Sequence, residues 1–341
     1  MPLTPAAYAG LTPNDILDAL DAIGFRPDGR VLQLNSYENR VHQVFLEDGE
    51  AVVTKFYRPG RWSDAQILEE HAFALELAEA EVPVVAPLIL PPATPGDAVQ
   101  RLGTPATLAV LQRADVRHRL SVSPRRAGRE PDLEDRDTLQ RLGYFIGRLH
   151  AVGRRRPFQH RRRIDLLADA HAAIATVRAL PHLGGDTHPT WPAAADQAVQ
   201  AMRRALDRCP PWQPLRLHGD CHLGNVLWRE GRPHMVDLDD ACTGPAVQDL
   251  WMLAATEDSN RSGQLGELLQ GYEQFCSFDR RELALIEPLR TLRMLRHSAW
   301  LAERWDDPAF PAAFPEFGSP AYWSQQATQL REQVEFMSDD G

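Results

Sequence analysis

The chain has 341 residues, 43% of them hydrophobic, and a formal net charge of −10. This composition is typical of a globular protein rather than a disordered one, and the acidic balance disfavours general nucleic-acid binding. No apolar run reaches the roughly 18 residues of a membrane span, and the N-terminal residues lack the pattern of a secretory signal. Four cysteines without a CxxC pair indicate reduced thiols, so we expect a cytoplasmic protein.

The basic residues are almost all of one type. Of the 37 lysines and arginines, Lys55 is the only lysine. Lysine carries a compact point charge and arginine a wide planar fork, so a site that needs a narrow ammonium would resist replacement by arginine. Lys55 is therefore either a chance survivor on the surface or a functional cation, and its surroundings must decide between the two.

The N-terminal part of the chain predicts a helix and then a β-rich segment. Residues 12–22 form a helix in which Thr12 is the N-cap. Three runs of strand-forming residues follow, at 31–34, 40–46 and 51–57. Lys55 lies in the third run. Apolar residues then recur at helical spacing over 64–79.

The rest of the chain is mainly helical. We expect strands at 82–87 and 106–112, and a polar connection over 122–136. Helices are expected at 138–152, 165–179, 192–207, 246–255, 262–276, 280–305 and 321–337. The predicted fold class is α+β, with a small β-rich lobe over residues 1–113 and a large helical lobe over residues 114–341.

Polar residues gather in the one stretch of the second lobe that breaks the helical pattern. Asp220 and Asn225 lie five residues apart, and Asp237 follows a short strand-like pair. Their two carboxylates and one carboxamide are oxygen donors, which are the ligands that Mg²⁺ prefers. Because protein-bound Mg²⁺ often bridges the phosphates of ATP, the set predicts a Mg²⁺·ATP site.

The same spacing occurs in the kinase catalytic loop, in which an Asp base is followed five residues later by a metal-binding Asn. The loop reads His218-Gly219-Asp220-Cys221-His222-Leu223-Gly224-Asn225, where protein kinases have H-R-D. It resembles the aminoglycoside phosphotransferase and choline kinase superfamily, which shares the protein-kinase fold. The resemblance implies a bilobal protein-kinase-like fold, catalytic roles for Asp220 and Asp237, and metal binding by Asn225 and Asp237.

The resemblance also gives a role to the N-terminal lobe. In kinases a lysine on the third strand pairs with the ATP phosphates and with a glutamate of the next helix. Lys55 matches that lysine, and of the two candidates, Glu69 and Glu70, we assign Glu69 as its partner. The turn at 35–39 lacks a glycine-rich pattern, and we expect Ser36 and nearby backbone N–H groups to cap the phosphates.

Longer strings resemble one family within this superfamily, the bacterial stress response kinase A family. They are Leu34–Val41, Lys55–Pro59, Leu68–His71, Val236–Ala241 and Gly244–Met252. The resemblance implies a cytoplasmic serine/threonine protein kinase that uses ATP and Mg²⁺ and acts in the response to cell stress. The implied partner is a protein substrate with Ser or Thr acceptors, and we expect no nucleic-acid partner, no membrane and a monomer.

Further expectations concern regulation and charge. The resemblance implies that Asp249 accepts hydrogen bonds from the catalytic-loop backbone. The gap between Asp237 and Asp249 is too short for a long activation loop, and Gly219 replaces the phosphate-reading Arg, so we expect activity without prior phosphorylation. The basic run at 154–163 is expected to be a solvated loop or to counter nearby acidic charge.

Two other functions stay open. One is a small-molecule kinase acting on an amino alcohol, homoserine or a sugar, with a pocket drawn from Glu257, Asp258, Glu273, Asp306 and Asp307. The other is a nucleotide-binding pseudokinase scaffold, against which the presence of the full set of predicted catalytic residues argues.

Overall fold

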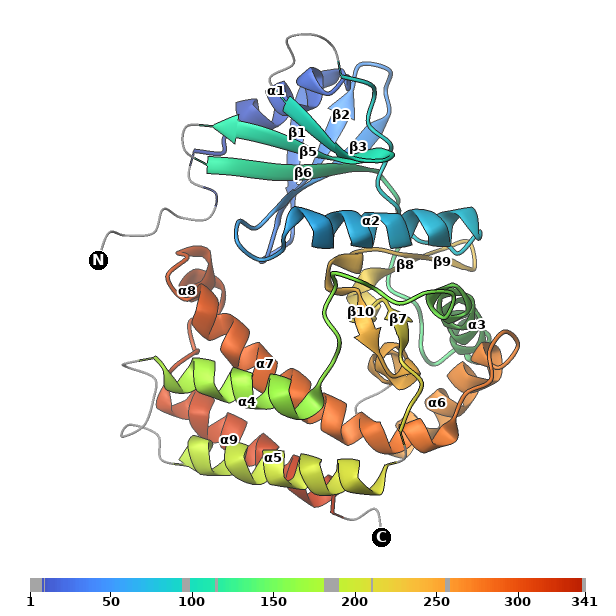
Figure 1. Ribbon diagram of the computed structural model, residues 1–341, viewed down its shortest axis with the longest axis vertical. Helices are drawn as coiled ribbons and strands as arrows, with labels where there is room; N and C mark the ends of the chain where they lie inside the picture. The colour runs from blue at the N-terminus through green and yellow to red at the C-terminus, as the bar shows by residue number, and fades with distance from the viewer. Residues whose placement is uncertain are drawn as a thin grey trace. The chain divides into compact units, whose positions relative to one another are not determined.

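The computed structural model describes residues 8, 10–93, 99–113, 116–180, 190–209, 211–254 and 258–338. The chain divides into two compact units, whose helices and strands are drawn in Figure 1. The first unit comprises Met1–Arg162, Arg216–Cys242 and Met252–Ser277, and the second comprises Arg163–Leu215, Thr243–Trp251 and Phe278–Gly341. Every side chain predicted for catalysis, nucleotide binding or metal binding lies in the first unit.

A six-stranded antiparallel sheet forms the N-terminal part of the first unit, with strand order β1-β2-β3-β6-β5-β4 (Figure 1). The strands are β1 Pro27–Leu34, β2 Arg40–Leu46, β3 Ala51–Tyr57, β4 Val99–Gly103, β5 Ala106–Arg113 and β6 Val116–Pro124. Four of them contain the runs predicted as strands, while β4 and β6 were not predicted. The strand expected at 82–87 is wrong, because Val84 makes only an isolated bridge, to Met235. Prolines on both sides of Val84 remove the donors of a ladder.

Strand β3 presents different side chains to the two faces of the sheet. Phe56 is buried in the core that the sheet forms with helix α1 (Pro13–Ala22). Tyr57 packs with Ile67 of helix α2 (Asp64–Glu79). Since side chains alternate along a strand, Lys55 shares the α2 face with Tyr57.

Helices α3 (Arg136–Gly153) and α6 (Asp258–Tyr272) of the first unit pack closely along glycines. A Cβ atom on Gly143 would lie 1.8 Å from the Leu268 carbonyl oxygen, and one on Gly271 would lie 1.8 Å from the Gln140 carbonyl oxygen. The backbones therefore approach to a distance that no larger residue permits.

Short elements that contain the predicted catalytic loop lie between α5 (Thr190–Arg208) and α6 in the sequence. They are β7 Leu215–Leu217, η2 Leu223–Asn225, β8 Val226–Arg229, β9 Arg232–Met235, η3 Leu238–Asp240 and β10 Cys242–Gly244, where η marks a 3₁₀ helix. Strands β8 and β9 form an antiparallel hairpin that joins the predicted catalytic loop to the predicted metal-binding segment.

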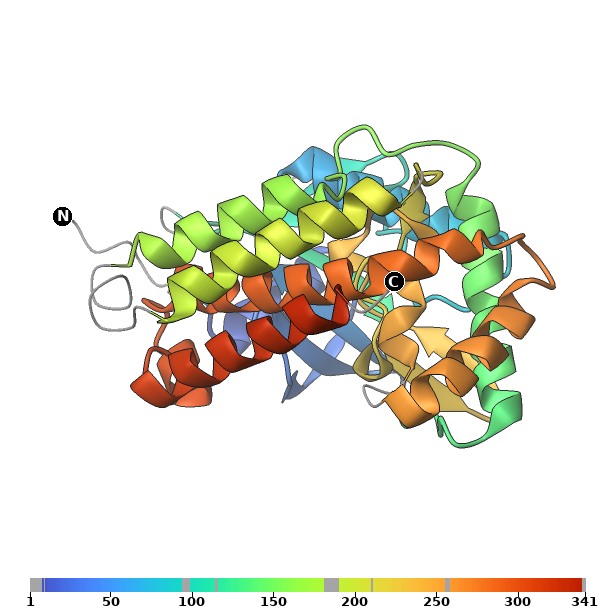
Figure 2. The same cartoon turned by 90° about the horizontal axis from the view of Figure 1, so that it is seen from below.

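The second unit is helical. Its long helices α4 (Leu166–Arg178), α5 (Thr190–Arg208), α7 (Ile286–Arg304) and α9 (Pro320–Phe336) lie side by side in Figure 2. The helix expected at 246–255 consists of two 3₁₀ turns, η4 (Ala246–Asp249) and η5 (Trp251–Leu253). The helix expected at 280–305 begins later, because its first residues form a 3₁₀ turn, η6 (Arg280–Leu285), before α7. The short helix α8 (Ala309–Ala313) was not predicted.

The structure has the predicted division into an N-terminal antiparallel sheet and a helical C-terminal part. The predicted lobe boundary falls between residues 113 and 114, and residue 114 lies outside the described residues. Within the described ranges, no helix combines the length and apolarity that crossing a bilayer requires.

Candidate active site

The loop that follows β7 is held against the segment after β9. His218 is fully buried, and its Nε2 atom lies 2.9 Å from the carbonyl oxygen of Val236. Gly219 has a φ of 88°, and a Cβ atom there would lie 2.2 Å from the carbonyl oxygen of Asp240. This left-handed backbone and close approach explain why glycine stands where protein kinases carry an arginine. The loop backbone at the residue before Asp220 is therefore packed against the Asp240 backbone.

Asp220 and Asn225 are joined by a contact inside the loop. The Asn225 Nδ2 atom donates to the Asp220 carbonyl oxygen over 2.9 Å, so the Asn225 amide oxygen points away from that contact. The Asp220 carboxylate is 26% exposed and lies 3.5 Å from the His222 Nε2 atom. The other ring nitrogen of His222 accepts the Gly224 N–H, which fixes the start of η2. The arrangement leaves the Asp220 carboxylate accessible to a second molecule.

Asp237 has an unusual backbone and an unusual partner. Its φ and ψ are 61° and 62°, a left-handed conformation that costs a non-glycine residue about 1–2 kcal/mol and often marks a functional site. The Lys55 Nζ atom lies 2.6 Å from its Oδ1 atom. Burial acts to raise the pKa of Asp237, but the Lys55 ammonium outweighs this and the pKa is lowered. Asp237 is therefore ionised, the state in which a carboxylate can bind a metal ion, and its side chain is 45% exposed.

The donor set fits a divalent cation that binds together with phosphate. Among the described residues, no group of three or more His, Cys, Asp or Glu side chains is arranged to hold a metal ion by itself. Mg²⁺ does not need such a group, since it commonly binds one or two protein ligands and completes its shell with phosphate oxygens and water. The Val236 N–H donates to the Asn225 carbonyl oxygen over 3.0 Å, which ties the Asn225 and Asp237 segments together.

The structure differs from the prediction at the glutamate of α2. The carboxylate of Glu69 accepts the backbone N–H groups of Gln159, His160 and Arg161 over 2.5–2.7 Å, so it does not serve Lys55. Glu70 is the helix carboxylate whose charge acts on Lys55. Consecutive residues of a helix point about 100° apart, so the assignment of Glu69 chose the carboxylate that faces residues 159–161.

Glu70 is buried, at 6% exposure, and its carboxylate lies 3.7 Å from the His71 Nε2 atom. Burial raises its pKa to about 7, although the Lys55 ammonium acts in the opposite direction. The neighbouring His71 has a pKa lowered by burial to about 3 and is neutral. Its Nε2 atom lies 2.7 Å from the hydroxyl of Tyr57, and its Nδ1 atom 2.9 Å from that of Thr107. These contacts hold α2 against β3 and β5 at the residue next to Glu70.

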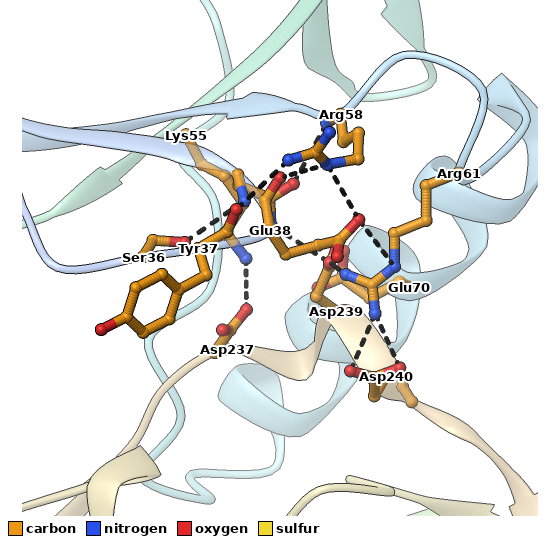
Figure 3. A network of polar contacts seen from close by, with 12 residues as sticks. Ser36, Tyr37, Glu38, Lys55, Arg58, Arg61, Glu70, Asp237, Asp239 and Asp240 are labelled. Atoms are coloured by element: carbon orange, nitrogen blue, oxygen red, sulfur yellow. Dashed lines mark hydrogen bonds and ion pairs between the residues drawn. The ribbon is translucent and has the colours of Figure 1, made fainter. Parts of the chain in front are cut away.

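The turn predicted to cover the phosphates is tied to the segment after Asp237 (Figure 3). Ser36 Oγ accepts the Asn39 N–H over 3.3 Å, which closes the turn on itself. The Asn39 Nδ2 atom then donates to the Asp239 Oδ2 atom over 3.1 Å. Arg61 contacts the carboxylates of Asp239 and Asp240 as well. The sequence analysis did not assign Asn39, Arg61, Asp239 or Asp240 to the site. The one pattern in the sequence that pointed to them was the run of acidic residues after Asp237.

The basic run at 154–163 mostly neutralises acidic residues and caps main-chain oxygens. Arg156 lies 2.9 Å from the Glu76 carboxylate of α2, and the buried Arg216 lies at the same distance. Arg161 donates to the carbonyl oxygens of Asp239 and Ala241. The run thus counters nearby acidic charge within the first unit. Asp249 is buried in the second unit, and its predicted role stays a prediction.

The chain is similar to known phosphotransferases and kinases. Residues 30–286 match the model of the phosphotransferase enzyme family. Stress response kinase A of Salmonella choleraesuis is 40% identical over 337 residues, covering 97% of this chain and 95% of the relative. The serine/threonine protein kinase RdoA of Salmonella typhimurium has the same identity and coverage. A solved complex of the amicoumacin kinase hAmiN with AMP-PNP, Ca²⁺ and Ami superposes with a TM-score of 0.70 at 19% identity, over 95% of this chain and 93% of that one.

The fold and the matches define a phosphotransferase with an aminoglycoside-phosphotransferase-like kinase fold and an alcohol group as its acceptor. The chain belongs to the phosphotransferase enzyme family and, within it, to the bacterial stress response kinase A family.

Proposed function

We propose that this protein transfers the γ-phosphoryl group of ATP, with Mg²⁺, to serine and threonine hydroxyls of proteins, as part of a bacterial stress response. The observation that carries the proposal is the Lys55–Asp237 ion pair, which lies in the same unit as Asp220 and Asn225. Phosphoryl transfer needs a cation for the phosphates, oxygen ligands for a metal ion and an accessible carboxylate, and these residues can supply all three. The relatives named as stress response and serine/threonine kinases support a protein acceptor.

In the proposed reaction the acceptor hydroxyl approaches the γ-phosphorus in line with the bond to the β-phosphate oxygen. Asp220 orients the hydroxyl and accepts its proton, a new P–O bond forms to the acceptor, and ADP leaves as the old bond breaks. The positions of the groups supply most of the rate enhancement, so no covalent enzyme intermediate is needed.

The residues around Asp220 have separate tasks. Asn225 and Asp237 would hold Mg²⁺, which neutralises charge on the β- and γ-phosphates when bound. Lys55 exchanges its Asp237 contact for the phosphates, with Glu70 as the buried carboxylate behind it. Ser36 and the backbone of its turn cover the phosphates. Since Gly219 is held by its backbone rather than by a charged side chain, we propose that activity does not require phosphorylation of the enzyme.

The first test is transfer of label from γ-labelled ATP with Mg²⁺. The wild type is compared with Asp220→Asn and with Asp137→Asn, a matched control at an exposed position of α3. One set of reactions contains a generic protein acceptor, and the other contains amino alcohols, homoserine and sugars.

Label on Ser or Thr of the protein acceptor, lost in Asp220→Asn and kept in Asp137→Asn, is the expected result. Label on a small molecule alone would agree with the proposed mechanism and overturn the proposal of a protein acceptor. Glu257, one of the acids considered for a small-molecule pocket, lies outside the described residues. Tight nucleotide binding without transfer to any acceptor would identify a scaffold instead.

A further inference from the structure

Arg61 contacts the phosphate-covering turn and the metal-binding segment with a single guanidinium group. Its Nε atom lies 3.7 Å from the Glu38 carboxylate, which belongs to the turn. One terminal nitrogen contacts the Asp239 carboxylate, and the other lies 2.9 Å from both oxygens of Asp240 (Figure 3). Three carboxylates from two distant parts of the sequence thus meet at one cation.

We propose that Arg61 is a positioning residue that sets the distance between the phosphate-covering turn and Asp237, so that Mg²⁺·nucleotide binding depends on it. The inference rests on the proposed function of this site and adds a residue that acts through the carboxylates of Glu38, Asp239 and Asp240. Arg61 precedes α2 and follows β3, so it belongs to the same stretch of chain as Lys55.

The turn side of this contact is fixed by Arg58. Its Nε atom lies 3.3 Å from the Glu38 carboxylate and 3.1 Å from the Glu38 carbonyl oxygen, and a terminal nitrogen reaches the Tyr37 carbonyl oxygen at 3.3 Å. The Arg58 N–H donates to the Asn39 Oδ1 atom. Glu38 therefore reaches Arg61 from a turn whose own backbone is held.

The main chain of η3, on the other side of Arg61, is held by Arg161. It donates to the Asp239 and Ala241 carbonyl oxygens, and its guanidinium lies 4.0 Å from the centre of the Trp62 ring. Arg161 thus holds the main chain of η3 while Arg61 holds its side chains. Asp237, the residue just before η3, has the left-handed backbone that only its surroundings can maintain.

Charge makes Arg61 necessary at this place. The Asp239 side chain is 4% exposed, and without Arg61 its carboxylate would keep only the Asn39 amide among the side-chain contacts described above. An unbalanced buried carboxylate beside Asp237 would repel it and displace η3. A lysine offers a point charge and cannot contact three carboxylates in a planar fork, so the requirement is for arginine.

The test compares Arg61→Met and Arg61→Lys with Arg117→Met, which removes an arginine paired to Asp64 at an exposed part of the same unit. The measurements are the half-saturating Mg²⁺ concentration, the KM for ATP, kcat and the melting temperature. We expect Arg61→Met to raise the half-saturating Mg²⁺ concentration and the KM by on the order of 10-fold. Arg61→Lys should recover little of this, and Arg117→Met should change neither constant.

A double-mutant cycle tests the contact between Arg61 and Asp240. If Arg61 acts through η3, Asp240→Asn should weaken Mg²⁺·nucleotide binding, and its effect should not add to that of Arg61→Met. Additive effects, or an Arg61→Met protein with a lower melting temperature but wild-type constants, would overturn the inference. Binding of Mg²⁺ with a non-hydrolysable ATP analogue is measured in parallel. A loss of that binding in Arg61→Met would support Arg61 even if no acceptor were phosphorylated, so the two proposals can fail separately.

Discussion

The Lys55 Nζ atom lies 2.6 Å from the Asp237 Oδ1 atom, although 182 positions of sequence separate the two residues. This contact joins strand β3 to the segment that follows β9. Under the proposed function, phosphate and metal would compete for these two groups, so the ion pair would open when Mg²⁺·ATP binds.

Replacement of Lys55 should therefore affect nucleotide use more than folding. We expect Lys55→Met to lower kcat/KM for ATP by on the order of 100-fold, because a preorganised charge on the phosphates is lost. Lys55→Arg should not restore it, since a planar guanidinium is wider than the compact ammonium that contacts Asp237. Steady-state kinetics give the measurement, and wild-type kcat/KM in Lys55→Arg would contradict this account.

The adjacent glutamates of α2 should give opposite phenotypes. Glu70→Gln removes the carboxylate behind Lys55, and we expect a roughly 10-fold lower kcat/KM without a lower melting temperature. Glu69→Gln weakens three main-chain hydrogen bonds to residues 159–161, so we expect a loss of about 1–3 kcal/mol of stability with kcat/KM nearly unchanged. Kinetics and urea unfolding of both variants distinguish the roles; exchanged phenotypes would restore Glu69 as the partner of Lys55.

The raised pKa of Glu70 predicts a pH dependence of stability. The pKa is about 7 in the folded protein and 4.5 for the free side chain, so the folded state holds the proton more tightly. The stability contributed by protonated Glu70 is full below 4.5 and is lost as pH rises through 7. Relative to Glu70→Gln, the wild type should lose up to about 3 kcal/mol between about pH 5 and pH 8. Urea unfolding without Mg²⁺ measures this; a constant difference between the two proteins across that range would refute it.

The close approach of α3 and α6 allows a matched series of glycine substitutions. Gly271→Ala or Gly143→Ala would push a Cβ atom into a facing carbonyl oxygen, so we expect a loss of about 3 kcal/mol or more. Gly263 and Gly266 lie in the same helix α6 with nothing within 4 Å of an added Cβ atom. There the change to alanine should stabilise by about 0.5–1 kcal/mol, because helix propensity is the remaining effect. Equal effects at Gly271 and Gly263 would show that the helices are not in close contact.

Helices and strands that are defined by local sequence patterns could be predicted well. The capped helix α1, strands β2 and β3 and helix α2 follow the expected bounds, because caps and periodicity are local signals. Strands β4 and β6 were missed, since a strand at this place is defined by its partner in the sheet rather than by its own residues.

The site shows the same limit at the level of single residues. The positions of Asp220, Asn225 and Asp237 followed from a spacing, and Lys55 from its rarity, but the assignment of Glu69 over Glu70 did not follow from either. Two adjacent acids on a helix are equivalent in sequence, and only the loop at 159–161 shows which of them is occupied elsewhere. The same holds for Arg61, one of 36 arginines, whose partners lie far away in the sequence.

The environment of the sole lysine has a practical consequence for chemical labelling. Burial acts to lower the pKa of Lys55, but the Asp237 and Asp239 carboxylates outweigh it and keep the pKa well above its usual range. An amine-directed acylating reagent reacts with the unprotonated form, so this side chain should react slowly while the ion pair is closed. Apart from the N-terminal amine, the chain offers such a reagent one target. A single peptide in a mass spectrum would then report the occupancy of the site in a cell extract, without any engineered probe.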